Sequence, residues 1–562
     1  MQFDADTSDI SNLLKKCEKI DGQGFGSAQN LLGVYAYDDN TLILIDYVPK
    51  DPSAPIPGKV RVRIPLNNLR YPNDLFENSF GKLAAKHFFT EYTYRSIRYE
   101  GRPWLWMEPP GQAVLERNSV DIIDGYLEIR LDFIPPYKSR RRLSGGRLRR
   151  LFSQTIPRVI DSLKATNKKK EFLAEIKKTL EDQEYLRKRL REEGFVAFIA
   201  NGSILPRRGD SDFPLPEAIP FKVPDKLAYE FHLPNHGTVR GLALKKGETI
   251  VFAGANFHGK TTILEALRVA HYNHIPGDGR EFVIAVDELP LIAVENRRIV
   301  RGVDISPFMR LLPGIENTKS FTTNSASGST SQAASLVEAL ECGVLGFLID
   351  EDSSAVNFLL KDDLLKQVVP RDLEPITPLI ERLPIITNQF KVTAIFAVGA
   401  LGQILKAAHT TYLVSNFTVS DVIKLSKTPN NAVQERIGIK RRIPEPNSIP
   451  NGRVREVSYD EIVITWHGRR IKIDLRGIGI KRTLKEKAQV RALAYAITYA
   501  SRYADGIRSL KEIVDQVMAD IKQFGIDIIN PFHEEIHINF AMFTRYQLFY
   551  ALSRLPTLRI KN

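Results

Sequence analysis

The sequence has few of the residues that carry redox chemistry or covalent cross-links. Its 562 residues include only 2 cysteines and 5 methionines. Cys17 and Cys342 lie far apart in the chain, so they provide neither a disulfide framework nor the paired spacing of a zinc site. We expect both to be buried thiols in a reducing compartment, which predicts a cytoplasmic protein.

A long apolar segment is also missing. The most apolar long stretch, residues 392–405, is too short to span a bilayer and contains Gln403. The first six residues are acidic and lack the apolar core of a secretory signal. We therefore expect a soluble protein that acts inside the cell, without a membrane partner.

Apolar and basic residues are plentiful. Hydrophobic residues make up 43% of the chain, which suffices for sizeable cores, and the length suggests about three domains. There are 79 lysines and arginines against 66 acids, which gives a formal charge of +13. This excess favours a polyanionic partner such as nucleic acid, although composition alone is equally consistent with a basic surface that has no specific partner.

Residues 1–228 are interpreted as an N-terminal α+β domain with a basic loop at 138–150. Alternating and apolar runs predict its strands, and leucine and isoleucine at helical spacing predict its long charged helix. The expected elements are strands at 41–48 and 60–65, a hairpin at 120–131 and a helix at 163–193.

Two proline-rich segments, 213–220 and 441–452, are interpreted as linkers. They bracket a phosphate-loop domain assigned to residues 229–432, and residues 433–562 form a smaller C-terminal α+β domain. The predicted fold class is α/β, with a nucleotide-binding domain between two α+β domains.

The most specific motif is the phosphate loop at residues 254–262, which matches G-x-x-x-x-G-K-T. Its glycines let backbone N–H groups approach phosphate oxygens, its lysine reaches the β- and γ-phosphates, and the next hydroxyl binds Mg²⁺. A strand-like run precedes it and a helical run follows, as the motif requires. The expected ATP-binding residues are Gly254, Asn256, His258, Gly259, Lys260, Thr261 and Thr262. His258 has an alternative interpretation as a variable loop position.

A second element that a phosphate loop needs is an acidic strand end. Residues 345–351 provide it, because an apolar run ends in Asp350 and Glu351. Asp350 and Thr261 are the expected Mg²⁺ ligands. Glu351 is the expected general base for the attacking water, and with Lys260 it forms the predicted catalytic pair.

Small hydroxyl residues open an apolar helix at residues 326–340, just before the acidic strand. An ordinary serine-capped helix is one interpretation. The order of signature segment, helix and acidic strand favours another, in which Ser327, Gly328 and Ser329 form the ABC signature and contact ATP. Residues 143–147, L-S-G-G-R, also match that signature, but they precede the phosphate loop and are interpreted as part of the basic loop.

Runs of residues along nearly the whole chain resemble one family, the predicted ATPases of the ABC class. The matching runs lie at 20–22, 61–66, 196–198, 202–207, 272–281, 302–308, 326–334, 350–352 and 374–378. The resemblance implies Mg-ATP binding, gated hydrolysis and head-to-tail pairing. In that pairing Ser327–Ser329 of one chain close on the phosphate held by Lys260 of another, which implies a homodimer.

Several features depart from ordinary ABC proteins. Gly399 stands where a switch histidine is expected, and the nearest histidine, His409, is predicted to be structural. No clear Q-loop glutamine is found, with Glu295 and Asp304 as weak candidates. Phe231 and His232 are weak candidates for stacking on adenine.

Two hypotheses for the use of ATP stay open. The first is a nucleotide-driven clamp on nucleic acid, with RNA favoured over single-stranded DNA. It depends on basic clusters at 138–150, 168–170, 436–442 and 469–472, and on Tyr137 and Phe152 as stacking residues. The second is an ATP-gated protein-interaction switch without nucleic acid.

Overall fold

The computed structural model describes residues 7–38, 40–54, 56–100, 103–138, 141–310, 317–370, 373–423, 436–532 and 536–561. Residues 1–6, Arg140 and the predicted domain boundary at 432 lie outside the described residues. Contacts divide the chain into two compact units. Unit 1 comprises Met1–Lys178, Glu486–Ala492 and Asp520–Met542, and unit 2 comprises Thr179–Lys485, Leu493–Ala519 and Phe543–Asn562. The domain limits inferred from the sequence stay a prediction.

Unit 1 contains a mixed sheet in the order β1-β2-β3-β4-β8-β5, with β7 also paired to β8. Its strands are β1 (Ser8–Asp9), β2 (Gly33–Ala36), β3 (Leu42–Tyr47), β4 (Gly58–Pro65), β5 (Leu105–Trp106), β7 (Val120–Ile123) and β8 (Tyr126–Phe133). The predicted hairpin is confirmed, because β7 and β8 are joined by Asp124 and Gly125, both of which have positive φ.

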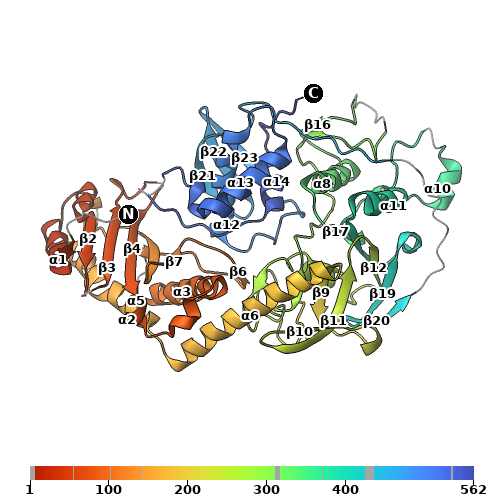
Figure 1. Ribbon diagram of the computed structural model, residues 1–562. Coiled ribbons are helices and arrows are strands. Elements are labelled where there is room, and N and C mark those ends of the chain that lie inside the picture. Colours follow the sequence, from red (N-terminus) through yellow and green to blue (C-terminus); the bar gives the residue numbers. More distant parts are fainter. Residues whose placement is uncertain are drawn as a thin grey trace. The chain divides into compact units, whose positions relative to one another are not determined.

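The helices of unit 1 cover this sheet. They include α1 (Ile10–Lys19), α2 (Leu66–Leu69), α3 (Ser79–Glu100), α4 (Gly145–Arg150), α5 (Ile156–Leu163) and the first part of α6 (Asn167–Glu192). Helix α3 packs against α5 and β7 (Figure 1). The long charged helix expected at 163–193 is confirmed as α6.

The parallel sheet of unit 2 has the order β17-β18-β12-β19-β20. Its strands are β12 (Thr249–Ala253), β17 (Gly346–Asp350), β18 (Thr393–Val398), β19 (Thr410–Ser415) and β20 (Thr418–Ile423). The first four pair in parallel, and β20 returns antiparallel to β19. β12, β17 and β18 read as almost continuous apolar runs because they are buried on both faces.

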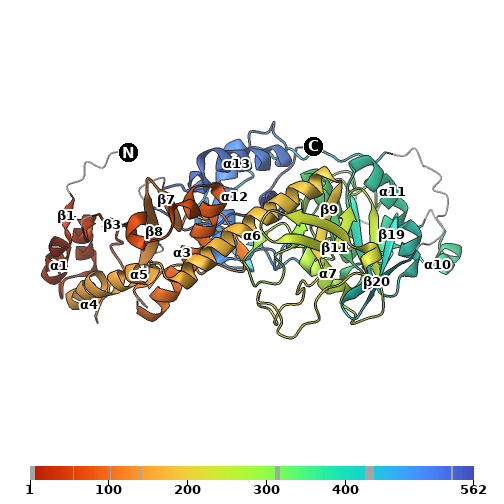
Figure 2. The same cartoon turned by 60° about the horizontal axis from the view of Figure 1, so that its bottom comes forward.

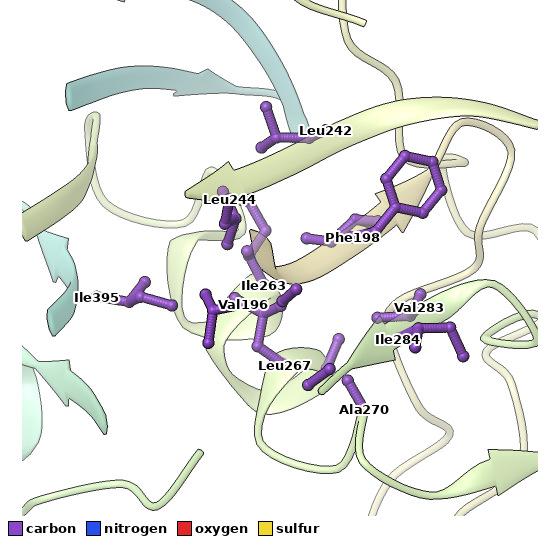
Figure 3. Packing of buried hydrophobic residues seen from close by; sticks show 14 of the residues in the cluster. Val196, Phe198, Leu242, Leu244, Ile263, Leu267, Ala270, Val283, Ile284 and Ile395 are labelled. Carbon is purple, nitrogen blue, oxygen red and sulfur yellow. The ribbon is translucent and has the colours of Figure 1, made fainter. Parts of the chain in front are cut away.

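An antiparallel sheet with the order β10-β11-β9-β14 packs beside the parallel one. Its strands are β9 (Phe195–Ala200), β10 (Tyr229–Leu233), β11 (Gly237–Lys245) and β14 (Val283–Ala285). Figure 3 shows side chains from β9, β11, β14, β18 and helix α7 (Lys260–Leu267) gathered in one core. Leu186 and Leu190, from the second part of α6, join this core, and Figure 2 shows α6 lying along β9 and β11. The core thus fixes the helix that follows the phosphate loop.

The rest of unit 2 holds two smaller sheets and further helices. The strands are β15 (Val300–Val303), β16 (Phe321–Thr323), β21 (Arg453–Val457), β22 (Glu461–Trp466) and β23 (Arg469–Asp474). The helices are α8 (Gly328–Cys342), α9 (Val356–Leu359), α10 (Asp363–Val368), α11 (Leu379–Phe390) and α14 (Arg545–Ser553). Helices α12 (Lys487–Ala500) and α13 (Leu510–Phe524) each have residues in both units. Among the described helices, none has the length and apolar content needed to cross a membrane.

The two proline-rich segments are not extended linkers, which corrects the sequence interpretation. The Arg208 N–H donates to the Phe213 carbonyl oxygen, and the Leu215 N–H donates to the Pro206 carbonyl oxygen. The start of the first segment therefore pairs with residues 206–208 within unit 2. In the second segment Arg442 and Ser448 are fully buried. Proline interrupts helices and strands in this segment, but the segment stays packed in the protein, and its buried backbone groups need hydrogen-bond partners there.

The first glycine of the second signature-like match, Gly145, has a packing role. Gly145 begins helix α4 beside the end of α1, and a Cβ at this position would lie 2.4 Å from the Cys17 carbonyl oxygen. Asp21 accepts a 2.7 Å hydrogen bond from the Gly145 backbone N–H. Residues 145–150 are therefore helical, and their interpretation as loop was wrong. The close approach of two backbones explains the glycine without a signature role.

We predict that Gly145→Ala destabilises the contact between α1 and α4 by about 1–3 kcal/mol, the usual cost of overpacking. Gly146→Ala is the matched control, because a Cβ there meets nothing within 4 Å. Hydrogen exchange on the full chain should show faster exchange in both helices for the first variant only. Equal exchange in the two variants would contradict the packing role of Gly145.

Candidate functional site

Three parallel strands end at the same edge of the sheet. Ala253 pairs with Val398, and Asp350 pairs with Ala397, so β12, β17 and β18 finish together. The segments that follow them are the phosphate loop, Glu351 and Gly399. Ligands of open α/β sheets bind in the crevice beyond these carboxyl ends. The strand register therefore brings the predicted nucleotide residues of three distant segments to one place.

The phosphate loop has the backbone shape that its glycines allow. Gly259 caps α7 with φ +93°, and a Cβ on Gly254 would lie 2.3 Å from the Val414 carbonyl oxygen. Phe257 also has positive φ, at +67°, and 96% of its surface is exposed. A bulky residue rarely adopts this conformation, so the loop stores backbone strain where the ligand is expected.

Lys260 lies at the first position of α7 and is 9% exposed. Its Nζ donates a 2.7 Å hydrogen bond to the carbonyl oxygen of Ala255, inside the same loop. The ammonium group is thus held over the N-terminus of a helix, where backbone N–H groups and the helix dipole also favour an anion. Its position matches the role predicted for it, phosphate binding.

Thr261 and Asp350 meet as predicted for a metal site. The Thr261 hydroxyl donates a 2.7 Å hydrogen bond to Asp350 Oδ2. Burial raises the pKa of Asp350, and the Thr261 hydrogen bond opposes that shift. A hydroxyl and a carboxylate oxygen side by side are donors that Mg²⁺ prefers, so the pair fits a Mg²⁺ ion that keeps waters and phosphate oxygens as its other ligands.

Glu351 is held by the backbone of the segment that follows β18. Its carboxylate accepts hydrogen bonds from the N–H groups of Gly399 at 2.8 Å, Ala400 at 3.0 Å and Leu401 at 3.2 Å. Three successive N–H groups pointing at one anion form a concave anion site of the kind called a nest. We refer to residues 399–401 as the Glu351 nest. The sequence analysis missed these donors, although a glycine-rich run after a buried strand was a usable signal.

Gly399 also touches the phosphate loop. A Cβ on Gly399 would lie 2.8 Å from Asn256 Oδ1 and 3.6 Å from Lys260 Nζ. The position of the expected switch histidine is thus filled by backbone alone. His409 lies elsewhere and accepts a 2.9 Å hydrogen bond from the Thr249 N–H through Nδ1, which fits the structural role predicted for it.

His258 supports the turn between β19 and β20. Its Nδ1 accepts a 2.9 Å hydrogen bond from the Asn416 N–H, and its carbonyl oxygen accepts one from the Phe417 N–H. Asn416 and Phe417 both have positive φ, as a two-residue hairpin turn requires. The Phe417 ring lies so close to Gly259 that a Cβ there would be 2.4 Å away. The hairpin therefore braces the phosphate loop.

The predicted signature residues open helix α8. Ser327 is exposed at the N-cap position, and its hydroxyl lies 2.9 Å from that of Thr330. Within the described part of the chain, no hydrogen bond or ion pair joins Ser327, Gly328 or Ser329 to the phosphate loop of the same molecule. The predicted signature residues thus make no direct contact of these kinds with the phosphate loop of their own chain, although Gln332, further along α8, bonds to Ser354 beyond Asp350.

Buried charges anchor α8 behind its exposed N-terminus. We call this set the buried charge network. It comprises Glu295, Arg298, Glu338, Glu341, Arg442 and Arg554. Arg554 bridges Glu295 at 2.9 Å and Glu338 at 2.7 Å, while Arg442 bonds Glu341 at 2.6 Å. Three acids and three arginines balance, so each buried charge has an opposite partner.

The weak Q-loop candidates have structural partners. Burial disfavours the charged form of Glu295, but Arg554 and Arg298 hold its pKa below the usual value. The Glu295 backbone N–H donates to the Ser331 hydroxyl of α8 at 3.0 Å. Asp304 accepts from the Ser306 N–H and hydroxyl, as a turn-capping residue does. Glu295 is thus tied to helix α8, and Asp304 closes a local turn.

Two aromatic candidates are ruled out by burial. Phe231 is 3% exposed and packs edge-on against Phe198, so it cannot stack on adenine. Phe152 is fully buried beside Phe133, so it cannot stack on a nucleic-acid base. Both predictions were wrong because an aromatic residue in an element with an inward face is usually a core residue. Tyr137 stays partly exposed, at 37%.

Comparison with known proteins agrees with this architecture. A family model described as the P-loop domain of ABC ATPases matches residues 169–445. A model for the N-terminal region of ATPases of the ABC class matches residues 10–166, and one for the MRB1590 C-terminal domain matches residues 453–561. These matches define the class of the protein as an ABC-class P-loop ATPase. The chain belongs to the family of ABC-class ATPases that carry an N-terminal and a C-terminal domain around the P-loop domain, as the sequence predicted.

Individual relatives add little about function. The uncharacterized protein MJ1628 of Methanocaldococcus jannaschii is 37% identical over 199 residues, which are 34% of this chain and 44% of that protein. The match thus spans less than half of the relative. Among solved structures, CbiO1 of Clostridium perfringens, part of the ABC transporter complex CbiONQ, is 13% identical over 41% of this chain and 88% of its own, with a TM-score of 0.24. A likeness this weak supports no conclusion about activity.

We predict that Gly399→Ala lowers ATP turnover about tenfold, because the new methyl group would displace Asn256 and the Glu351 nest. Gly402→Ala is the matched control, since a Cβ at Gly402 meets nothing within 4 Å. Steady-state hydrolysis by the two variants tests this. Normal turnover by Gly399→Ala would show that the close approach has no catalytic consequence.

Proposed function

We propose that the protein binds Mg-ATP on the phosphate loop, hydrolyses it in a site shared by two copies, and uses this cycle as a clamp on nucleic acid, with RNA favoured. The observation that carries the nucleotide part is the 2.7 Å contact of Thr261 with Asp350 beside the buried Lys260. Lys260 binds the β- and γ-phosphates, and Thr261 with Asp350 holds Mg²⁺, which neutralises phosphate charge when bound. The other phosphate-binding residues are Gly254, Asn256, His258, Gly259 and Thr262.

Glu351 is the proposed general base. The Glu351 nest holds its carboxylate at the edge where the phosphate loop lies, with Gly399 against Asn256 and Lys260. This contact offers a route by which phosphate could be sensed without a switch histidine. A shift of Asn256 or Lys260 toward phosphate would move Gly399, and Gly399 would move the base. The nest therefore takes over the proposed role of that histidine.

The shared site rests on the exposed start of α8. Ser327 is solvent-exposed, and Ser329 is half-buried, at the N-terminus of a 15-residue helix. Neither bonds to the phosphate loop of its own chain among the described residues. We propose that Ser327, Gly328 and Ser329 contact the γ-phosphate bound by a second copy, which makes the active form a homodimer.

Nucleic-acid binding is proposed from the basic cluster of unit 1. Arg142, Arg147 and Arg150 are exposed there, and Arg147 lies over the Trp104 ring at 5.9 Å. Arg141 and Arg149 pair with exposed acids, at 2.5 Å and 2.7 Å. Exposed pairs contribute little free energy, so phosphates could replace those acids. Arg442 drops out of the proposed surface because it is buried with Glu341.

An ATP-gated protein-interaction switch is the second candidate. It is favoured by the number of basic residues that already have acidic partners, including Arg441 with Glu512 and Lys472 with Glu461. Stimulation of the ATPase by cell extract that survives nuclease treatment would support the switch over the clamp. Cross-linking of nucleic acid to the protein in cells would support the clamp.

We predict that Lys260→Ala abolishes ATP binding, because a neutral methyl group replaces the ammonium group over the loop. Glu351→Gln should keep ATP affinity within about threefold and lower hydrolysis at least 100-fold, the usual scale of general-base catalysis. It should also trap an ATP-bound dimer, which light scattering would detect. Ser329→Arg in the same background should keep ATP binding but lose the dimer. Normal turnover by Glu351→Gln would exclude Glu351 as the base.

We predict that oligouridylate binds with a strong dependence on salt. Replacing Arg142, Arg147 and Arg150 by alanine should lower the salt slope by about 0.7 for each lost contact with a single strand. Arg95→Ala removes an equally exposed arginine, with a side chain 65% exposed, outside the cluster and serves as the control. Filter-binding curves between low and moderate salt measure both. Absence of binding at low salt would rule out the clamp and leave the ATPase untouched.

A further inference from the structure

Unit 2 contains a cavity of about 680 Å³ beside the start of α7. Thr261, Thr262 and Glu265 form one wall of this cavity. Residues of two further segments, 205–212 and 480–485, also line it. Within the described residues, none of Gly254–Lys260 lines it. The cavity therefore shares Thr261 and Thr262 with the phosphate loop but no other residue of it, and its volume is in the usual range for a small-molecule ligand.

Arg280 is the residue that suggests what the cavity holds. It lines the cavity, is 5% exposed, and uses Nε and Nη2 only to donate to the Leu205 carbonyl oxygen. Among the described residues, no carboxylate lies at ion-pair distance from its guanidinium group. Burial and the neighbouring Arg207 lower its pKa to about 9, against the opposing charges of Asp278, Asp212 and Glu265. A buried arginine at a cavity wall that has acids nearby but none in direct contact is a suitable receptor for an anion.

The other charges of the cavity are mixed in sign. Arg207, Lys481, Arg482 and Lys485 also line it, together with Asp210, Asp212, Glu265 and Asp460. Two ion pairs join its two loop segments, Arg482 with Asp210 at 2.5 Å and Lys485 with Asp212 at 2.7 Å. A bare phosphate would face several carboxylates here. A ligand that has a phosphate at one end and hydroxyl or N–H donors at the other satisfies both signs.

Tyr459 supplies an apolar surface to the same cavity. Its side chain is half exposed at 50%, and it lines the cavity with Lys481. An aromatic ring beside cations is the arrangement on which a nucleobase stacks while its phosphate is neutralised. Phosphate, ribose hydroxyls and a base therefore each find a suitable group.

We propose that this cavity binds one nucleoside monophosphate unit, with its phosphate on Arg280 and Lys481 and its base against Tyr459. The unit is either a free mononucleotide or the 5′-phosphorylated end of a nucleic-acid strand. Carboxylates such as Glu265 accept hydrogen bonds from ribose or base. The proposal is separate from the clamp, since a free mononucleotide would fill the site even if no strand is bound.

Calorimetric titration of the full chain carrying Lys260→Ala tests the proposal, because that variant removes ATP from the phosphate loop. AMP and UMP should bind at one site per chain, and adenosine and uridine should bind at least tenfold more weakly. Adding Arg280→Met should weaken UMP at least tenfold. Lys481→Ala and Tyr459→Ala, both at exposed positions, should each weaken it about fivefold, whereas the exposed Lys246→Ala, outside the cavity, should leave it unchanged.

The source of the ligand follows from a second titration in the same background. A 5′-phosphorylated oligouridylate that binds more tightly than the 5′-hydroxyl form, and loses that advantage with Lys481→Ala, identifies a strand end. Binding of mononucleotides alone identifies a free ligand. The proposal is overturned if UMP does not bind the Lys260→Ala protein, or if neither Lys481→Ala nor Tyr459→Ala changes the affinity for UMP.

Discussion

The buried charge network is the constraint on which the arrangement of unit 2 depends. Glu338 and Glu341 lie on helix α8, Glu295 and Arg298 precede β15, and Arg554 follows directly after α14. Removing one partner of a buried pair typically costs 3–5 kcal/mol, because the remaining charge is left uncompensated. Segments more than two hundred residues apart in the sequence are therefore held to helix α8 as one body.

The functional elements fall into two groups according to what holds them in position. The phosphate loop and the Glu351 nest are fixed by the parallel sheet and its core, whereas the start of α8 is fixed by the charges around Glu338. Within the described residues the two groups meet at Gln332 of α8, whose side chain donates to the Ser354 hydroxyl at 2.8 Å and accepts from the Ala355 N–H at 2.9 Å. The Ser354 hydroxyl in turn donates to the Asp350 carbonyl oxygen at 2.7 Å, so a change at either group can reach the other through this chain of contacts.

Local sequence signals predicted the parts of the site whose chemistry resides in side chains. Lys260, Thr261 and Asp350 were predicted as site residues because each belongs to a motif with fixed spacing and follows a strongly apolar strand, and the structure brings Thr261 and Asp350 into contact, while their roles stay a prediction. The Glu351 nest was not found, because its donors are backbone N–H groups that any residue carries. Phe152 and Phe231 were misassigned because exposure depends on tertiary packing, which a single sequence does not reveal. Arg442 was misread as a surface cation for the same reason.

The use of backbone donors at Gly399, Ala400 and Leu401 has a consequence for sequence divergence. Most side-chain replacements at Ala400 and Leu401 leave the N–H groups in place, and only proline removes one. Two proteins could therefore share this nest while showing no identity at those positions. Conversely, the one position with a strict size limit is Gly399, where the neighbouring Asn256 leaves no room for a side chain. We therefore expect sequence variation at positions 400 and 401 and none at position 399.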